Sequence, residues 1–237
     1  MKTYLALTIL LSSVLIVVGL TPWAAEGGQA TFQDGSYVGY SDANDKGYAM
    51  ATVNIAEDQI VAVELTEFTG YGAEKDWDTY PYEPSVKARE ELAGEFVAKN
   101  SADVDTYTGA TSSSEKYRQA VARALEKALV EPASDNTYFD GTFLGQTEPN
   151  EKGQRAVALV TIENDRIVDV VLEQTIDESN EFKGEDYQYG PFHMAREEMA
   201  RRFIAANSTD VDTFTGATGS STAWMAAVEK ALEHARR

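Results

Sequence analysis

Alternation of apolar and polar residues predicts a β-hairpin near the start of the chain. Residues 48–55 alternate in this way, with Val53 and Ile55 on one face. After the polar turn 56–58, the alternation resumes in residues 59–65. The apolar face of this second run consists of Val61, Val63 and Leu65. A period of two residues is typical of strands with one buried face, and the short turn favours antiparallel pairing.

A further strand is expected before the hairpin, at residues 36–40, and two helices are expected after it. Residues 85–99 place Leu92, Phe96 and Val97 on one helical face. A second helix is expected after the polar loop that follows. Its apolar face consists of Tyr117, Val121, Leu125 and Ala128. The predicted order is therefore three strands, a helix, a polar loop and a second helix.

The same order of elements recurs in the second half of the chain. Strands are expected at residues 142–145, 157–162 and 167–172. Their apolar positions keep the period of the first half, and they are Val160, Ile162, Val168, Val170 and Leu172. A repeat of about 100 residues is long enough to bury a core of its own. The predicted fold class is α+β, with two tandem copies of a small domain. Each copy is expected to have an antiparallel sheet of about three or more strands and two helices.

The polar loop between the two helices is the most closely repeated stretch of the chain. It reads DTYTGAT from Asp105 to Thr111 and DTFTGAT from Asp212 to Thr218. Over fifteen residues around the two copies, twelve positions are identical. A buried repeat would need only matching apolar positions. Near-identity among small polar residues therefore indicates chemistry.

The glycines and last threonines of the two copies are typical of a ligand site. Gly109 and Gly216 allow the backbone to approach a ligand closely or to adopt a positive φ. The hydroxyls of Thr111 and Thr218 stand where a helix is expected to begin. The free N–H groups and the dipole at such a helix end favour an anion, most commonly a phosphate.

Asp105 and Asp212 add a carboxylate six residues before each of these threonines. A phosphate site alone would favour basic groups. An acid here therefore indicates metal binding or help in deprotonating the threonine hydroxyl. The alternative is an ordinary capped helix, since Ser112 and Glu115 have the spacing of a capping box. The repetition of residues that have no capping role favours the chemical interpretation.

The pattern Asp-Xaa-Xaa-Thr-Gly-Ala-Thr resembles the flavinylation motif of FMN-binding domains. Such domains occur in the flavin-carrying subunits of sodium-pumping and Rnf-type redox complexes and in exported electron-transfer flavoproteins. The resemblance implies that a flavin transferase, using FAD and Mg²⁺, joins the phosphate of FMN to the last threonine of each copy. It implies two covalent FMN groups, on Thr111 and Thr218, and Asp105 and Asp212 as the acidic residues that the transferase needs. The other motif residues implied in the two sites are Thr108, Gly109, Ala110, Thr215, Gly216 and Ala217.

Aromatic residues before the first helix of each half are candidates for contact with a flat ring. Tyr82 and Tyr189 align as tyrosine in both halves, so they are the first candidates for flavin contact. Tyr107 and Phe214, inside the motifs, are the next. The alternative, that these aromatic residues fill the core of a small sheet, stays open at this point.

Composition and charge exclude several classes of protein and site. The chain has 39 acidic and 20 basic residues, a net charge of −19, which disfavours nucleic acid or an anionic membrane surface as partner. It has no cysteine, which excludes disulfides, thiolate metal sites, iron–sulfur ligation and c-type haem attachment. His193 and His234 lie on different stretches, so a histidine metal site or a Ser-His-Asp triad is not expected, and no metal site is predicted.

The first thirty residues are expected to be an export segment. Lys2 precedes an uncharged run over residues 4–20, which fits either a signal peptide or an N-terminal membrane anchor, and both stay open. Either one places the remainder outside the cytoplasm, at the cell surface or in the periplasm. The predicted domains are residues 31–131 and 137–237, joined by a short polar linker, and each is expected to fold alone.

The resemblance implies an extracytoplasmic electron carrier with one FMN in each domain. Its electrons would come from a membrane NADH or quinone dehydrogenase and pass to an extracellular acceptor. The alternative is an exported flavin-dependent reductase of one small molecule, and whether the chain is an enzyme is left open. A scaffold that has lost its flavin is disfavoured because both motifs are intact.

Overall fold

The structure is a computed structural model that describes residues 30–178 and 181–237. The predicted export segment, apart from Ala30, lies outside the described residues. Among the residues that are described, no helix combines the length and the apolar character needed to cross a membrane.

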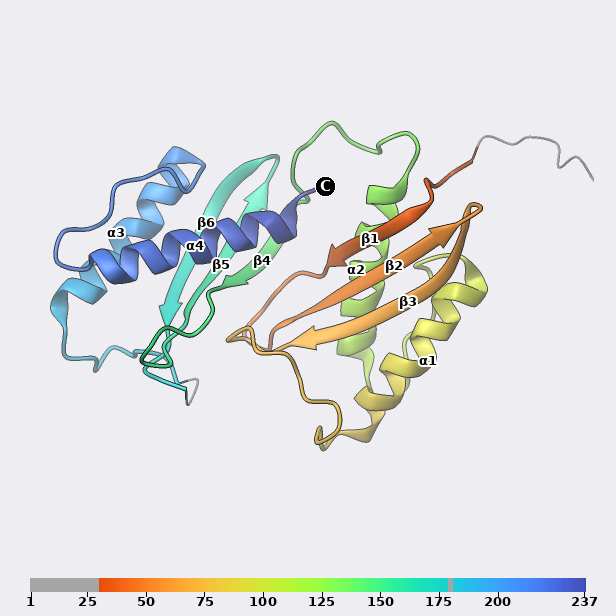
Figure 1. Ribbon diagram of the computed structural model, residues 1–237, viewed down its shortest axis with the longest axis horizontal. Coiled ribbons are helices and arrows are strands. Elements are labelled where there is room, and N and C mark those ends of the chain that lie inside the picture. Colours follow the sequence, from red (N-terminus) through yellow and green to blue (C-terminus); the bar gives the residue numbers. More distant parts are fainter. Residues whose placement is uncertain (1–29, 179–180) are drawn as a thin grey trace, which may run out of the picture.

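Within the described residues, each half of the chain has three antiparallel strands and two helices, as the alternating and helical patterns predicted (Figure 1). The elements of the first half are β1 (Gly35–Tyr40), β2 (Tyr48–Ala56), β3 (Gln59–Phe68), α1 (Glu83–Lys99) and α2 (Thr111–Ala128). Those of the second half are β4 (Gly141–Gln146), β5 (Ala156–Glu163), β6 (Arg166–Gln174), α3 (Gly190–Ala206) and α4 (Thr218–Ala235). The strand orders are β1-β2-β3 and β4-β5-β6. The predicted α+β class with two tandem copies is confirmed.

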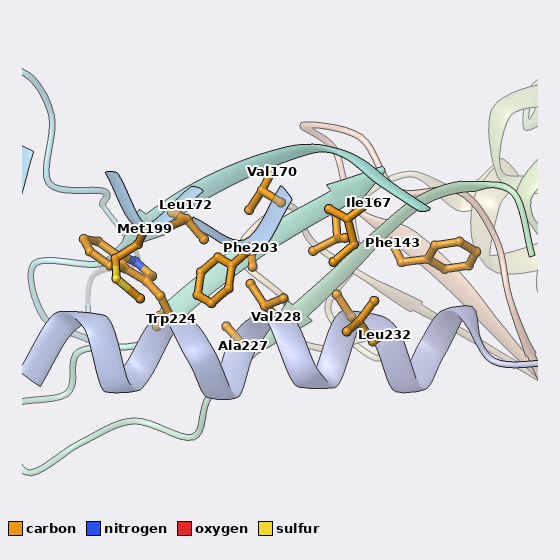
Figure 2. Packing of buried hydrophobic residues seen from close by; sticks show 14 of the residues in the cluster. Phe143, Ile167, Val170, Leu172, Met199, Phe203, Trp224, Ala227, Val228 and Leu232 are labelled. Carbon is orange, nitrogen blue, oxygen red and sulfur yellow. The ribbon is translucent and has the colours of Figure 1, made fainter. Parts of the chain in front are cut away.

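Both helices of a half pack on the same face of its sheet, and the core lies between them. In the second half, Figure 2 shows Trp224, Val228 and Leu232 of α4 pointing toward the sheet. Met199 and Phe203 of α3 complete the layer, and all five side chains are buried. Complete burial of one such side chain contributes about 1.5–3 kcal/mol. The sheet and the helices therefore stabilise each other.

A glycine in the first strand of each sheet lets the motif helix approach closely. A Cβ placed on Gly39 of β1 would lie 2.1 Å from the Ala120 carbonyl oxygen of α2. The same test at Gly145 of β4 gives 2.0 Å to the Ala227 carbonyl oxygen of α4. Both distances are far inside van der Waals contact. The two glycines thus allow α2 and α4 to lie close to their sheets, and this packing positions the motif threonines at the helix starts.

The prediction that Val61 and Val168 face the core is wrong, because each half contains a β-bulge. Asn54 pairs with Ala62 and Ile55 with Ile60, so Val61 has no partner in β2. The register of the second sheet shifts at the matching point and leaves Val168 unpaired. An extra residue reverses the alternation on one side of it. Val61 and Val168 are therefore 54% and 43% exposed.

The two halves also share an interface that the sequence did not predict. Its apolar cluster combines residues from the first half with residues on the outer face of the second sheet, and its buried members are Ala43, Tyr48, Leu144 and Val157. The C-terminal end of α4 reaches β1, where the His234 ring stacks on Tyr40 at 4.0 Å between centroids (Figure 1). Each half keeps a separate core. Independent folding stays a prediction, and a separated second half must expose the side chains of Leu144 and Val157.

Polar contacts hold the same interface. The Arg123 guanidinium donates to the Tyr40 and Asp140 carbonyl oxygens, each at 2.8 Å, and to the Asp42 carboxylate at 2.7 Å. These partners come from both halves. The Arg123 side chain is 9% exposed, so its charge is largely shielded from water and its partners compensate it. The linker is therefore not the only connection between the domains.

Candidate functional site

Each motif loop is a tight turn that only glycine fits well. Gly109 has φ +85° and Gly216 has φ +91°, values that side-chain-bearing residues rarely adopt. In the first half, the Ala110 N–H donates to the Tyr107 carbonyl oxygen at 3.0 Å, and this bond closes the turn. The second half repeats it between Ala217 and Phe214, also at 3.0 Å. The repeated glycines therefore have a conformational cause.

A buried serine in each motif helix holds the loop from below. The Ser114 hydroxyl accepts from the Tyr107 N–H at 3.0 Å and donates to the Ala110 carbonyl oxygen at 2.8 Å. The second half repeats both bonds, through Phe214, Ser221 and Ala217. Part of the identity between the copies is thus structural, because these bonds fix the loop on the first turn of the helix.

The two candidate attachment threonines are the first residues of α2 and α4. Thr111 and Thr218 are both exposed, and the residues before them, Ala110 and Ala217, supply no side-chain cap. The capping-box alternative is therefore not observed, since α2 begins one residue before Ser112. Each hydroxyl lies beside N–H groups of an uncapped helix end, where a phosphate is favoured.

A cavity of about 750 Å³ opens beside Thr111. It lies between the end of β3, the loop that follows it and the first turns of α1 and α2. Its wall includes the motif residues Gly109, Ala110 and Thr111. The lining also includes aromatic, basic and acidic residues, among them Tyr80, Tyr82, Lys46, Lys75, Lys116, Glu67, Glu74 and Asp76.

The cavity wall contains a buried ion pair and a second lysine that bonds to a backbone carbonyl group. The Lys75 ammonium bonds to the Glu67 carboxylate, whose residue is 2% exposed, and lies 4.8 Å from the centre of the Tyr80 ring. The Lys116 ammonium donates to the Gly47 carbonyl oxygen at 2.8 Å. Burial lowers the pKa of Lys116, and the Glu67 carboxylate partly offsets this shift. The cavity lining thus combines lysines and tyrosines with three acidic residues, Glu67, Glu74 and Asp76.

The structure brings the predicted tyrosines to the motif loops. The Tyr82 hydroxyl donates to the Gly109 carbonyl oxygen at 2.8 Å, and the Tyr189 hydroxyl donates to the Gly216 carbonyl oxygen at 2.6 Å. Both tyrosines are about half exposed, at 49% and 48%. They are therefore not core residues, and each hydroxyl bonds to the carbonyl group two residues before the attachment threonine. Direct contact with a flavin stays a prediction.

The motif aspartate, the middle threonine and the motif aromatic residue lie elsewhere. Asp105, Tyr107 and Thr108 line a separate hollow that they share with Leu92 of α1. Asp105 is exposed and lies 3.9 Å from the Lys99 ammonium. In the second half Asp212 is likewise exposed, and Phe214 packs against the core as Tyr107 does in the first half. Asp105 is thus accessible to another protein, but it does not line the cavity of Thr111.

The lysines of the cavity were missed in the sequence because no local pattern connects them. Lys46 follows β1, Lys75 follows β3 and Lys116 lies in α2. A weak signal existed, since Lys75 and Lys183 each precede a tyrosine whose ring they approach, at 4.8 and 4.9 Å. Only the folded chain places the three first-half lysines on one wall.

The cavity of the first half fits a flat aromatic ligand with a phosphate. Its volume lies in the usual range of ligand pockets, about 300–1,000 Å³. Tyrosine rings favour a flat ring system, and the lysines and the uncapped helix end favour an anion. Thr111 is exposed and lines the same cavity. The residues present therefore fit FMN.

The family model of the FMN-binding domain matches residues 43–126 and 152–233, one segment in each half. Among solved structures, the chain is similar to the crystal structure of the CPE2226 protein from Clostridium perfringens. The two are 27% identical, the match covers 41% of this chain and 88% of that chain, and the TM-score is 0.36. No curated protein matches the chain.

Proposed function

Because the chain belongs to the FMN-binding domain family, we propose that it is an electron carrier with two covalent FMN groups, one on Thr111 and one on Thr218. The observation that carries the proposal is the setting of Thr111. Its exposed hydroxyl lies at an uncapped helix end and lines a cavity with tyrosine and lysine side chains. Thr218 has the same loop, the same helix start and the same neighbouring tyrosine.

Attachment forms a phosphoester between the threonine Oγ and the FMN phosphate. The bond that breaks is the pyrophosphate P–O bond of FAD, so AMP leaves, and the hydroxyl proton passes to a base of the transferase or to water. The chain's own part is to present the hydroxyl. The glycine turn exposes it, and the buried serine below the loop holds the turn in place. Asp105 and Asp212 are exposed, which suits contact with a transferase and its Mg²⁺.

The bound flavin supplies the redox chemistry, and the protein binds, orients and tunes it. The side chains that would hold the ring in the first half are those of Tyr80 and Tyr82, together with Lys75 and Lys116 of the same cavity lining. We place the protein outside the cytoplasm, where covalent attachment prevents loss of the flavin by dilution. Its partners are then a membrane NADH or quinone dehydrogenase as donor and an extracellular acceptor.

Co-expression with a flavin transferase tests this proposal. Protein denatured in acid should keep two flavins per chain, measured by absorbance against protein mass. The reduced, loaded protein should then pass electrons to several unrelated acceptors at rates that rise linearly with acceptor concentration. Absence of acid-stable flavin contradicts the proposal. Saturable turnover of a single small molecule would instead favour an exported reductase.

A further inference from the structure

The two halves differ close to their attachment threonines, although the motif loops match. Five residues after Thr111, α2 has Lys116, whereas five residues after Thr218, α4 has Ala223. Equal spacing within equivalent helices places the two residues at the same point. The first half therefore has an ammonium group at a position where the second half has a methyl group.

Lys116 is held so that part of its ammonium group stays available to a ligand. The side chain is half-buried and lines the same cavity as Thr111. An ammonium group has three N–H donors, and the bond to the Gly47 carbonyl oxygen uses one of them. The Lys75 ammonium on the same wall is paired with the buried Glu67 carboxylate, so its charge is compensated. Unlike Lys75, Lys116 bonds to a neutral carbonyl group.

The second half is more apolar at a further matching position. Ser85, directly after Pro84 in α1, is 5% exposed and lines the first cavity. Phe192 follows the matching proline of α3, and its ring is 1% exposed. This ring packs against Tyr187 and Trp224, each at 5.2 Å between centroids, and the Lys183 ammonium lies 5.1 Å from its centre. Lys183, which corresponds to Lys75, is therefore covered by aromatic rings.

The buried partner of this lysine also differs between the halves. Glu67, at the end of β3, corresponds to Gln174 at the end of β6. The Lys183 ammonium donates to the Gln174 amide oxygen at 3.0 Å, and the same oxygen accepts from the Ser220 hydroxyl at 3.0 Å. Lys183 is 4% exposed, so its donors serve this internal network. Neither Lys183 nor Ala223 therefore takes the role that Lys116 has in the first half.

We propose that Lys116 is a flavin-binding residue peculiar to the first half, and that its ammonium group raises the midpoint potential of the first flavin. This inference rests on the proposed function, because it concerns the flavin attached at Thr111. Reduction by two electrons with uptake of one proton leaves the ring system one unit more negative. A nearby ammonium group in a partly buried cavity stabilises that charge, since the interaction is screened less than in water.

Midpoint potentials of chains with a single attachment site test the proposal. Thr218→Ala isolates the first flavin and Thr111→Ala isolates the second, and each is titrated with dithionite in the presence of reference dyes. Lys116→Ala should lower the potential of the first flavin and leave that of the second unchanged, which is the matched control. Ala223→Lys should raise the potential of the second flavin. Alanine at this position is compatible with the fold, because α4 already has it.

An unchanged potential of the first flavin in Lys116→Ala, or an equal shift of both flavins, overturns the proposal. A second measurement is independent of covalent attachment. Without transferase, Lys116→Ala should weaken binding of free FMN by about tenfold, the loss expected for one hydrogen bond to a charged group. Quenching of FMN fluorescence measures this, and equal affinity overturns the proposal. If the transferase attached no flavin, the proposed function would fail while this binding measurement still decided the role of Lys116.

Discussion

His234 should make the stability of the chain depend on pH through the interface between the halves. Its ring stacks on Tyr40, and its Nδ1 bonds to the Leu144 carbonyl oxygen at 2.8 Å. The residue is 6% exposed. Burial lowers the pKa of His234 from 6.5 to about 4, the Leu144 bond opposes this shift, and the Lys230 ammonium adds to it. The Glu233 carboxylate acts in the opposite direction. The folded chain therefore holds this imidazole neutral where an unfolded chain would protonate it.

The sign and size of the effect follow from these two pKa values. Because the folded-state pKa lies below the unfolded value, the unfolded chain binds more protons between pH 6.5 and pH 4. The stability that the neutral ring contributes is complete above pH 6.5 and is lost as the pH falls through this window. One unit of pKa difference corresponds to about 1.4 kcal/mol, so the loss from this group between pH 7 and pH 5 is about 2 kcal/mol.

Urea unfolding of the wild type and of His234→Asn at pH 7 and pH 5 measures this contribution. Asparagine keeps an N–H donor for the Leu144 carbonyl oxygen but does not titrate. Carboxylates contribute equally to both chains, so the difference between them isolates His234. We expect the wild type to lose about 2 kcal/mol more than His234→Asn between the two pH values. Equal losses would refute the reasoning and show that the ring is accessible to protons in the folded state.

Two further predictions concern the motif loops. Asp105→Asn and Asp212→Asn should slow flavin loading by the transferase more than they shift the midpoint potential, because both side chains are exposed and Asp105 does not line the cavity. Time courses of flavin incorporation measure the loading rate. Loading at the wild-type rate would show that these aspartates have no part in attachment. Gly109→Ala should destabilise the chain by about 1–2 kcal/mol through its positive φ and slow loading of the first site. Its control, Gly94→Ala, lies in α1 with no atom within 4 Å of the new Cβ and should stabilise by about 0.5–1 kcal/mol in the same unfolding assay.

Periodicity predicted the elements of the fold well, because each half buries one face of a sheet and one face of each helix. It failed where a bulge changed the alternation. Val61 and Val168 have apolar side chains in the expected register, and nothing in the local sequence marks the extra residue. The bulge is visible only in the pairing with the neighbouring strand, where Ile60 and Ala62 take the consecutive partners.

The sequence of β5 contains an indication of the interface between the halves, but the comparison of the two copies drew attention away from it. Val157 and Leu159 are apolar on the face that turns away from the helices, and so is Leu144 of β4. A strand that is apolar on both faces indicates cover on both sides. In the first half Thr52 matches Leu159, whereas Met50 matches Val157. Because the two copies were treated as equivalent, the difference between Leu159 and Thr52 was not used to predict the interface.

Some residues of the candidate site could be predicted from the sequence, and others could not. Thr111, Gly109 and Tyr82 could be predicted because a local repeated pattern contains or precedes them. The lysines of the cavity could not, because Lys75 and Lys116 are distant in the chain and line one cavity only when α2 packs on β1 and β2. Residues selected by the fold rather than by a motif are therefore the ones that distinguish the two sites.

Intact mass of the chain after loading by a flavin transferase tests the central claim most directly. The wild type should gain the mass of two FMN groups, less one water for each ester. Thr111→Ala and Thr218→Ala should each gain one, and the double variant none, with all four chains folded by circular dichroism. Two flavins on either single variant, or one on the double variant, would contradict attachment at these threonines. Loss of both flavins in one folded single variant would contradict independent attachment.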